Sequence, residues 1–226
     1  ILIQKLDFIV VMPTYLIHRG LAKKNFKENT LTSFKYCFKR KYGVETDLHC
    51  TKDNKIVCFH DFNLNRKFKI NKKIKDLNYS YIRKISTINK TEIPLLSQLL
   101  KASKKKFPLL LELKPVFSSK NLKKLLFETK RHKNCSVISF KEKNLINLYK
   151  INKRLSLGLL FIASASLKNI KIKSKKKYVK FLVLEKKFLP NKKINLIKKK
   201  IYYYAIKNKS FFNKYKYSKN LIFENL

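Results

Sequence analysis

The chain has 226 residues and a hydrophobic fraction of 45%, which is enough apolar material for one sizeable core and argues against wholesale disorder. It carries 55 Lys and Arg residues against 13 Asp and Glu residues, so its formal net charge is +42. This excess predicts attraction to nucleic acid or to an anionic membrane surface, but lysines recur from end to end, which favours compositional drift over a dedicated nucleic-acid site.

The start of the chain and the cysteines indicate where the protein works. The apolar segment 8–17 is too short to cross a bilayer, which takes about 20 residues, and it lacks the basic leader and cleavage site of a signal peptide. The four cysteines form no Cys-x-x-Cys pair, so we expect buried, reduced thiols. These features predict a cytoplasmic protein.

Short apolar strands alternate with amphipathic stretches along the chain. The first half predicts a strand at 14–18, a helix at 29–42, a strand at 43–49, an apolar run at 55–60, a polar segment at 62–93, and a helix at 94–105 with Pro94 in its first turn. The second half predicts strands at 107–114, 135–140, 155–161, 180–185, 201–206 and 220–225, with helices at 119–131, 142–152, 191–200 and 210–218. A lysine-rich stretch separates the strands at 155–161 and 180–185.

Strands that are nearly all apolar and alternate with helices indicate a parallel sheet covered by helices. Eight candidate strands predict a closed (β/α)₈ barrel, the TIM barrel fold, in which 62–93 is a short insertion after the second strand region. We expect 1–226 to form one domain. A doubly wound open sheet is the alternative, although no Gly-x-Gly-x-x-Gly turn follows the first strand.

Polar side chains follow or end several of these strands. His18 and Arg19 come at the end of the first strand, where a titratable group and an anion binder suggest a site. Glu45 and Asp47 share one face of the second strand about 6.7 Å apart, so their carboxylates can converge. His60 ends the apolar run 55–60 in the same way that His18 ends the first strand.

Glu112 and Lys114 share one face of the strand at 107–114. A carboxylate and an ammonium in a buried strand are costly unless they are paired or bound to a metal. Together with Glu45 and Asp47, Glu112 would make an all-oxygen site that suits one hard cation, Mg²⁺ or Ca²⁺. Because Arg19 and Lys114 supply positive charge while the histidines can act as acid and base, the set favours phosphoryl transfer.

Several residues allow more than one interpretation. Cys50, Cys58, His49 and His60 could be imagined as a zinc set, but their strand parity argues against it. Asn29 either caps the first helix or faces the substrate. We expect Asp61 to orient a neighbour rather than bind metal, and Ser139 and Phe140 to lie in the core and at the barrel rim, with ligand contact as the alternative.

In order and spacing, the segments "HRG", "ENTLTSF", "GVETDLHCTKDNKIVCFHD" and "LLLELKP" resemble glycerophosphodiester phosphodiesterases of the compact single-domain bacterial type. The later segments "VISF" and "NLIFEN" resemble the family more weakly. The resemblance assigns a role to each polar residue at the strand ends: acid–base catalysis to His18 and His60, metal binding to Glu45, Asp47 and Glu112, and phosphate contact to Arg19 and Lys114. This chain departs from the family at Asn54, at Glu224, and at Tyr204, where the family often has a tryptophan that lines the pocket.

The resemblance implies that a glycerophosphodiester is converted into sn-glycerol 3-phosphate and an alcohol through a cyclic phosphate. The implied partner is that small molecule, and no obligate protein partner is evident. Two alternatives stay open. One keeps the chemistry and changes the substrate to a lysophospholipid or another phosphodiester lipid. The other is a non-catalytic basic protein that binds RNA or an anionic membrane through its charge.

Overall fold

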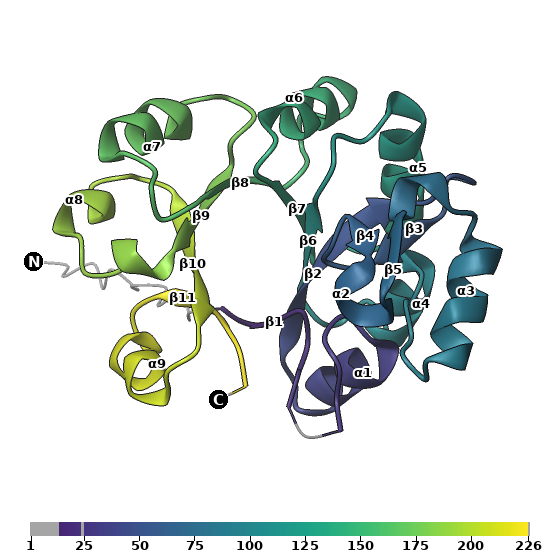
Figure 1. Ribbon diagram of the computed structural model, residues 1–226. Coiled ribbons are helices and arrows are strands. Elements are labelled where there is room, and N and C mark those ends of the chain that lie inside the picture. Colours follow the sequence, from purple (N-terminus) through teal and green to yellow (C-terminus); the bar gives the residue numbers. More distant parts are fainter. Residues whose placement is uncertain (1–13, 24, 226) are drawn as a thin grey trace, which may run out of the picture.

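Eight parallel strands form a closed barrel in the computed structural model, which describes residues 14–23 and 25–225 (Figure 1). They follow one another around the ring in chain order: β1 (Tyr15–His18), β2 (Gly43–Cys50), β6 (Leu109–Leu113), β7 (Cys135–Ser139), β8 (Leu157–Phe161), β9 (Phe181–Glu185), β10 (Lys200–Ile206) and β11 (Asn220–Phe223). The ring closes because β1 pairs in parallel with both β2 and β11. The predicted (β/α)₈ barrel is confirmed, and all eight predicted strands are present.

Helices surround the barrel and cover its outer face (Figure 1). They follow successive strands: α1 (Leu31–Lys39), α4 (Leu96–Ala102), α5 (Ser119–Thr129), α6 (Glu142–Ile151), α7 (Leu167–Ser174), α8 (Lys192–Asn195) and α9 (Lys209–Tyr215). The side chain of Thr30 caps α1 by accepting a hydrogen bond from the backbone N–H of Ser33, which satisfies one of the free donors of the first turn. Phe34, Cys37 and Phe38 then bury one face of α1 against the strands.

Three predictions about helices were wrong in detail. The helix expected at 94–105 is α4, whose N-cap is Leu95, so Pro94 lies just before the helix and outside its first turn. The helix expected at 191–200 is the single turn α8, in which only Ile194 is buried, and β10 already begins at Lys200. The lysine-rich stretch, for which no helix was predicted, contains α7, which buries only Ile170 and Ser174.

The segment predicted as a short insertion forms a small lobe of its own. A short strand, β3 (Ile56–Cys58), pairs antiparallel with β2 and leads into the lobe. The lobe contains β4 (Asn63–Leu64), α2 (Asn65–Phe68), β5 (Ile70–Lys73), the 3₁₀ turn η1 (Ile74–Asp76) and α3 (Tyr79–Ile88). Its apolar cluster is separate from the main core and comprises Val57, Phe59, Leu64, Phe68, Ile74, Leu77, Ile82, Ile85 and Ile93.

The interior of the barrel is apolar, which leaves polar groups for the ends of the strands. It is filled by Leu16, Leu110, Ile138, Leu160, Phe181, Val183 and Ile222. Gly158 has no side chain because a Cβ there would lie 2.3 Å from the ring of Phe181, so the glycine lets that ring occupy the barrel axis. The four cysteines are free thiols, three of them buried.

Among the described residues, no helix combines the length and the apolar character that crossing a bilayer requires. Residues 8–13 of the apolar segment noted at the start of the chain lie outside the described residues. The cytoplasmic location stays a prediction.

Candidate active site

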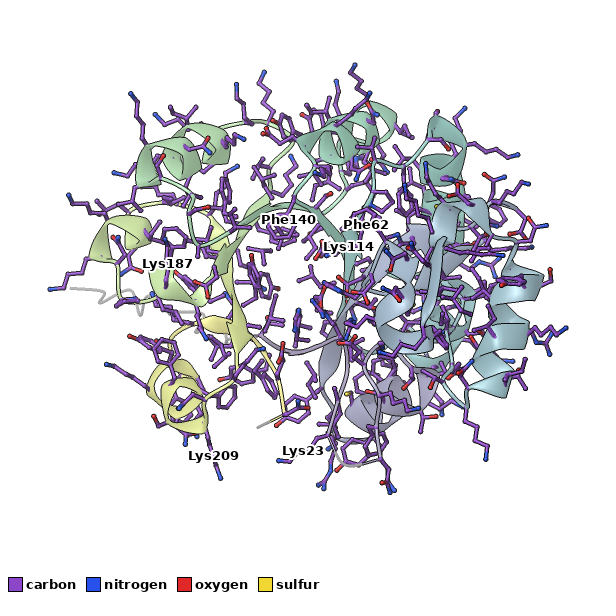
Figure 2. The ribbon with its side chains drawn as sticks, in the orientation of Figure 1. Lys23, Phe62, Lys114, Phe140, Lys187 and Lys209 are labelled. Carbon is purple, nitrogen blue, oxygen red and sulfur yellow. The ribbon has the colours of Figure 1, made fainter. Side chains whose placement is uncertain are left out.

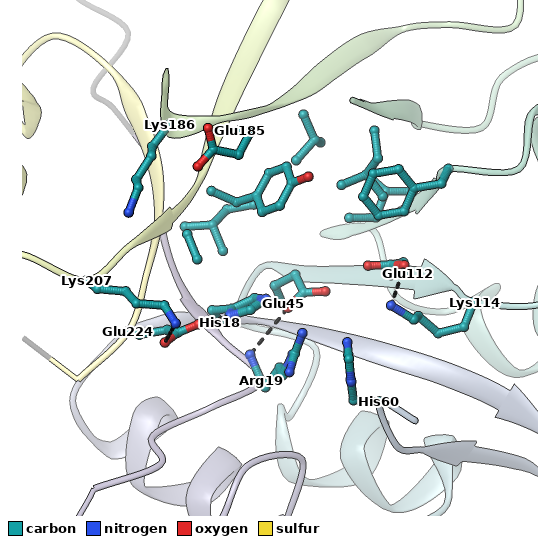
Figure 3. Close-up of a pocket in the computed structure, with 17 residues that line it drawn as sticks. His18, Arg19, Glu45, His60, Glu112, Lys114, Glu185, Lys186, Lys207 and Glu224 are labelled. Carbon is teal, nitrogen blue, oxygen red and sulfur yellow. Dashed lines mark hydrogen bonds and ion pairs between the residues drawn. The ribbon is translucent and has the colours of Figure 1, made fainter. Parts of the chain in front are cut away.

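A cavity of about 390 Å³ opens at the carboxyl ends of the barrel strands (Figure 3). Side chains from all eight barrel strands, or from the residues just after them, meet there although they are far apart in the sequence. The lining includes His18, Arg19, Glu45, His60, Glu112, Lys114, Phe140, Glu185, Lys186, Tyr204, Lys207 and Glu224. In a barrel of this kind, the loops that follow the strands build the functional site.

Three buried carboxylates form the floor of the polar part of this site. One oxygen from each of Glu45, Asp47 and Glu112 lies within 4.8 Å of the other two. The register of the sheet explains the convergence, because Asp47 pairs with Glu112 across β2 and β6 and Glu45 is two residues earlier on the same face. The three predicted metal ligands are therefore brought together.

The carboxylates cannot all carry their charge easily in this buried group. Burial, reinforced by Asp47 and Glu112, raises the pKa of Glu45 well above its usual range. Burial and the charge of Asp47 raise the pKa of Glu112 to about 7. Burial would also raise the pKa of Asp47, but Arg19 and Lys114 outweigh it and hold that pKa below its usual value. The cluster thus has an excess of negative charge that a cation would relieve.

The donor set fits a hard divalent cation. All three ligands offer oxygen, which is the donor that Mg²⁺ and Ca²⁺ prefer. Asp47 Oδ1 is buried and accepts no hydrogen bond from the described residues, and its ion-pair partner, the Nζ of Lys114, is 3.5 Å away, so this oxygen can still bind a metal ion. Among the described residues, these carboxylates are the one group of three or more potential metal ligands, so Cys50, Cys58, His49 and His60 do not assemble the zinc set considered above.

Two cations flank the carboxylates. The Nε of Arg19 lies 3.2 Å from Asp47 Oδ2, while the Nζ of Lys114 lies 3.1 Å from Glu112 Oε1 and 3.5 Å from Asp47 Oδ1. Arg19 reaches this position because it and Gly20 both have positive φ, which turns the chain sharply at the end of β1. The two side chains place positive charge beside the carboxylates, where an anionic substrate group can meet it.

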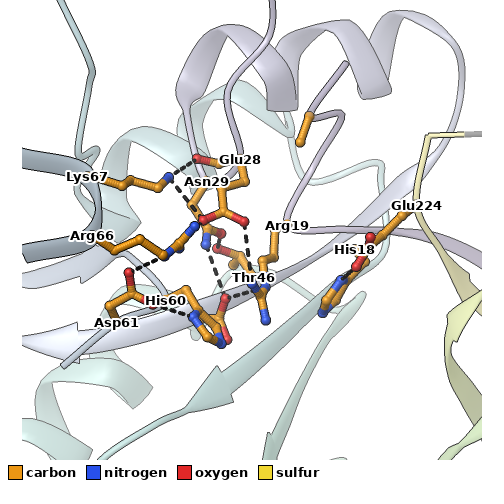
Figure 4. Close-up of polar contacts among 12 residues, drawn as sticks. His18, Arg19, Glu28, Asn29, Thr46, His60, Asp61, Arg66, Lys67 and Glu224 are labelled. Carbon is orange, nitrogen blue, oxygen red and sulfur yellow. Dashed lines mark hydrogen bonds and ion pairs between the residues drawn. The ribbon is translucent and has the colours of Figure 1, made fainter. Parts of the chain in front are cut away.

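Each of the two predicted catalytic histidines is held by a carboxylate. His18 Nδ1 lies 2.5 Å from Glu224 Oε1, and His60 Nδ1 lies 2.6 Å from Asp61 Oδ1 (Figure 4). With Nδ1 engaged in this way, Nε2 of each ring is the nitrogen left to act in the cavity. In Figure 3 the two rings lie on either side of Arg19.

A polar network ties the insertion lobe to this site. Arg66, at the start of α2, donates from Nε to Asp61 Oδ2 at 2.6 Å and contacts Glu28 through its other end (Figure 4). Glu28 also pairs with Arg19 at 3.3 Å and with Lys67 at 3.2 Å. Asp61 thus contacts His60 on one side and Arg66 of the lobe on the other, a position that fits the predicted orienting role.

The remaining predicted residues lie around the site in different roles. Asn29 is buried beneath it and donates to Asp47 Oδ2 at 3.1 Å, whereas Thr30 caps α1, so the capping interpretation of Asn29 was wrong. Ser139 is buried in the core, and its hydroxyl donates to the carbonyl of Leu113. Tyr204 lines the cavity and donates to the carbonyl of Phe161 at 3.1 Å.

Sequence reasoning missed Glu224, Glu28 and Arg66 as site residues. Glu224 follows β11 as His18 ends β1, so its place after an apolar strand was a usable signal. Glu28 and Arg66 lie 38 positions apart and outside any regular apolar pattern, so their contact could not be read from spacing.

Comparisons with known proteins agree with this geometry. Residues 18–223 match the model of the glycerophosphoryl diester phosphodiesterase family. One stretch is 41% identical over 66 residues to human lysophospholipase D GDPD1, covering 29% of this chain and 21% of that protein. Another is 32% identical over 74 residues to a glycerophosphodiester phosphodiesterase of Bacillus altitudinis, covering 32% and 30%. The chain thus spans less than a third of the length of these two curated relatives.

Solved structures share the fold over nearly the whole chain. A glycerophosphodiester phosphodiesterase from Thermotoga maritima superposes with a TM-score of 0.77 at 21% identity, covering 94% of both chains. A phosphodiesterase from Oleispira antarctica, solved with the product sn-glycerol-3-phosphate, gives 0.78 at 20% identity and covers 94% of this chain and 93% of that one. Because the family model spans residues 18–223, most of the chain, the chain belongs to the glycerophosphoryl diester phosphodiesterase family.

Proposed function

We propose that the protein is a metal-dependent phosphodiesterase that hydrolyses glycerophosphodiesters to sn-glycerol 3-phosphate and an alcohol. The observation that carries this proposal is a single cavity lined by two oriented histidines, two cations and the carboxylates of Glu45 and Glu112, with the buried carboxylate of Asp47 directly beside them. The family membership supports the reaction class. The Oleispira antarctica neighbour, which holds sn-glycerol-3-phosphate, supports the product.

Glu45, Asp47 and Glu112 would hold the divalent cation, Mg²⁺ or Ca²⁺. When bound there, such a cation supplies Lewis-acid polarisation of a phosphoryl oxygen. Arg19 and Lys114 bind the phosphate and orient it, since both lie on the rim of the carboxylate cluster. One divalent cation and these two side chains bring the three carboxylates and a phosphodiester monoanion close to neutrality, so the substrate is bound without excess charge.

The two histidines carry the protons. In the first step, Nε2 of one histidine takes the proton of a glycerol hydroxyl, whose oxygen attacks phosphorus, while the other histidine protonates the departing alkoxide. This step leaves a cyclic phosphate and a free alcohol. In the second step the roles are exchanged: water loses its proton and opens the ring, which gives sn-glycerol 3-phosphate. Glu224 and Asp61 hold the rings of His18 and His60 in the orientation that both steps need.

A second candidate keeps this chemistry and takes a lysophospholipid. The observation in its favour is the name of the human relative, a lysophospholipase D, which is 41% identical over 66 residues. Apolar side chains also line the inner wall of the cavity, among them Ile138, Leu160 and Val183.

The test measures how fast purified protein releases choline from glycerophosphocholine and from lysophosphatidylcholine. We expect turnover of the first substrate to disappear after exhaustive chelation and to return when Mg²⁺ or Ca²⁺ is added. Undiminished turnover after chelation would overturn the metal requirement. Faster turnover of lysophosphatidylcholine would favour the second candidate. Saturable RNA binding without turnover of either substrate would favour a basic binding protein.

A further inference from the structure

Large apolar side chains are exposed around the opening of the catalytic cavity. Phe62 is 54% exposed, Val116 47% and Ile162 55%, and they lie in the segments that follow β3, β6 and β8. Phe62 lies edge-on to His49 of β2 at 5.1 Å between ring centroids, which places it at the barrel rim (Figure 2). One exposed apolar residue is ordinary, but three on the rim of the same opening indicate a contact surface.

This apolar rim continues into a second cavity beside the catalytic one. It has a volume of about 580 Å³ and shares Glu185, Lys186 and Lys207 with the catalytic cavity. Ala163, which directly follows Ile162, lines it together with Pro190 and Phe211. The opening of the barrel thus combines apolar walls with lysine side chains. A surface that binds an amphiphile with an anionic head group needs both.

Four exposed lysines lie in the segments that follow other strands, at the same end of the barrel. They follow β1, β7, β9 and β10 and are Lys23, Lys141, Lys187 and Lys209. In Figure 2, Lys187 lies at the left of the molecule and Lys23 and Lys209 lie at its lower edge, outside the ring of strands. Of the acidic groups nearby, Glu28 and Asp61 pair with Arg66 and Glu224 pairs with Lys207, while Glu185 accepts a hydrogen bond from the backbone N–H of Lys187 and is outnumbered by the surrounding lysines. The charge that this end of the molecule presents outward is therefore positive.

We propose that this end of the barrel docks onto an anionic lipid bilayer. The docking surface consists of Phe62, Val116 and Ile162 with Lys23, Lys141, Lys187 and Lys209. Its apolar side chains enter the boundary between head groups and acyl chains, while the lysines contact lipid phosphates. Docking in this orientation turns the catalytic cavity toward the membrane.

The chemistry of the rim favours lipid over nucleic acid. Single-stranded nucleic acid is bound by basic grooves in which aromatic rings stack on the bases. Two of the three exposed rim side chains, Val116 and Ile162, are aliphatic and cannot stack in that way. Aliphatic groups ringed by lysines instead match the two layers of an anionic membrane surface, which are charged outside and apolar beneath.

The experiment compares the full chain with two matched triple variants in sedimentation with vesicles. The docking variant is F62S/V116S/I162S, and the control is F127S/I151S/L196S, whose residues are 67%, 44% and 73% exposed and lie on α5, at the end of α6 and just before β10. Vesicles are phosphatidylcholine alone or with about 30% phosphatidylglycerol, in about 150 mM NaCl. We expect the docking variant to bind anionic vesicles about tenfold more weakly and the control to bind like the unmodified chain.

A second comparison separates a docking surface from the effect of net charge. K23Q/K141Q/K187Q/K209Q and K105Q/K133Q/K153Q/K177Q each remove four exposed lysines from a molecule of net charge +42, the second set from loops that precede strands. We expect only the first variant to lose vesicle binding, again about tenfold or more. Equal losses in the two variants, or no binding of the unmodified chain to anionic vesicles, would overturn the proposal.

The result is independent of the proposed catalytic function. None of the substituted residues lines the catalytic cavity, so all variants should hydrolyse water-soluble glycerophosphocholine at the rate of the unmodified chain. Loss of vesicle binding with full turnover supports the docking surface. A chain that binds vesicles through this surface but turns over no glycerophosphodiester would refute the catalytic proposal and leave the docking proposal intact.

Discussion

At the scale of single residues, the carboxylate cluster provides the sharpest test of the site. Glu112→Gln keeps the volume of the side chain but removes one negative charge from the three carboxylates. We expect metal affinity to fall by at least about 10–100-fold, because even residues that only support the ligands have effects of that size. Activity should return in part at high Mg²⁺ or Ca²⁺, since mass action refills a weakened site. Activity measured across a metal titration checks this.

His60→Asn is the matched contrast, because it removes a proton carrier and leaves the carboxylates in place. Its lost turnover should not return with added metal at any concentration. Full activity of Glu112→Gln at limiting metal would mean that the carboxylate cluster is not the metal site. Recovery of His60→Asn with metal would mean that the histidine does not transfer the proton.

The lowered pKa of Glu28 should make the stability of the fold depend on pH. Burial would raise its pKa, but Arg66, Lys67 and Arg19 lower it to about 2 from an ordinary value of 4.5. Because the pKa is lower in the folded state, Glu28 stabilises the fold above about pH 4.5, and this contribution is lost as the pH falls from there toward 2. Glu28→Gln should therefore lower Tm at pH 7 and flatten the fall of Tm in acid.

Thermal denaturation followed by circular dichroism from neutral to acid pH measures that slope. Asp76→Asn on the exposed turn η1 controls for the loss of one carboxylate. Parallel Tm curves for Glu28→Gln and the unmodified chain would show that the Glu28 pairs do not stabilise the fold.

At the scale of elements, α2 acts on the catalytic site through Arg66. Burial would raise the pKa of Asp61, but its hydrogen bonds to Arg66 and His60 lower it. In Arg66→Ala the pKa of Asp61 should rise, so the carboxylate that orients His60 is protonated at a higher pH. We expect the acid limb of the kcat/KM profile to move to higher pH. At neutral pH Asp61 stays ionised, so the several-fold loss of kcat/KM that we expect there comes from weaker orientation of His60 once Asp61 has lost its partner Arg66.

Arg83→Ala is the matched control, since Arg83 is an exposed arginine on α3 of the same lobe. Its pH profile should coincide with that of the unmodified chain. An unmoved acid limb in Arg66→Ala would mean that the lobe does not act through Asp61.

The strands of the fold were predictable because each is an almost continuous apolar run, which a parallel barrel buries on both faces. The helices were harder to predict from the sequence than the strands. α7 buries only Ile170 and Ser174, so its lysine-rich sequence shows no apolar stripe. In the site, His18, Glu45 and Glu112 were predictable because they end or lie within strands of one ring. The bond of His18 to Glu224 spans 206 positions and depends on closure of that ring, which no local pattern encodes.

At the scale of the whole molecule, the net charge of +42 works against the compact state through self-repulsion. Screening by NaCl should relieve this repulsion, because the screening length falls from about 30 Å at 0.01 M to about 8 Å at 0.15 M. We expect Tm to rise by at least about 3 °C over this range, since 1 kcal/mol shifts Tm by about 2–4 °C in a chain of this size. A Tm that stays level or falls would contradict the prediction.

The pairing of β1 with β11 has a consequence for biosynthesis. β1 lies between β2, which is made soon afterwards, and β11, which is made some two hundred residues later. At about 5–20 residues per second, the ribosome needs roughly 10–40 s to supply that second neighbour. During this interval one edge of β1 faces outward with its backbone groups unpaired, and His18 has no Glu224 to meet. Until β11 emerges, the nascent chain therefore has an unpaired strand edge that can pair with another chain, and its active site lacks Glu224.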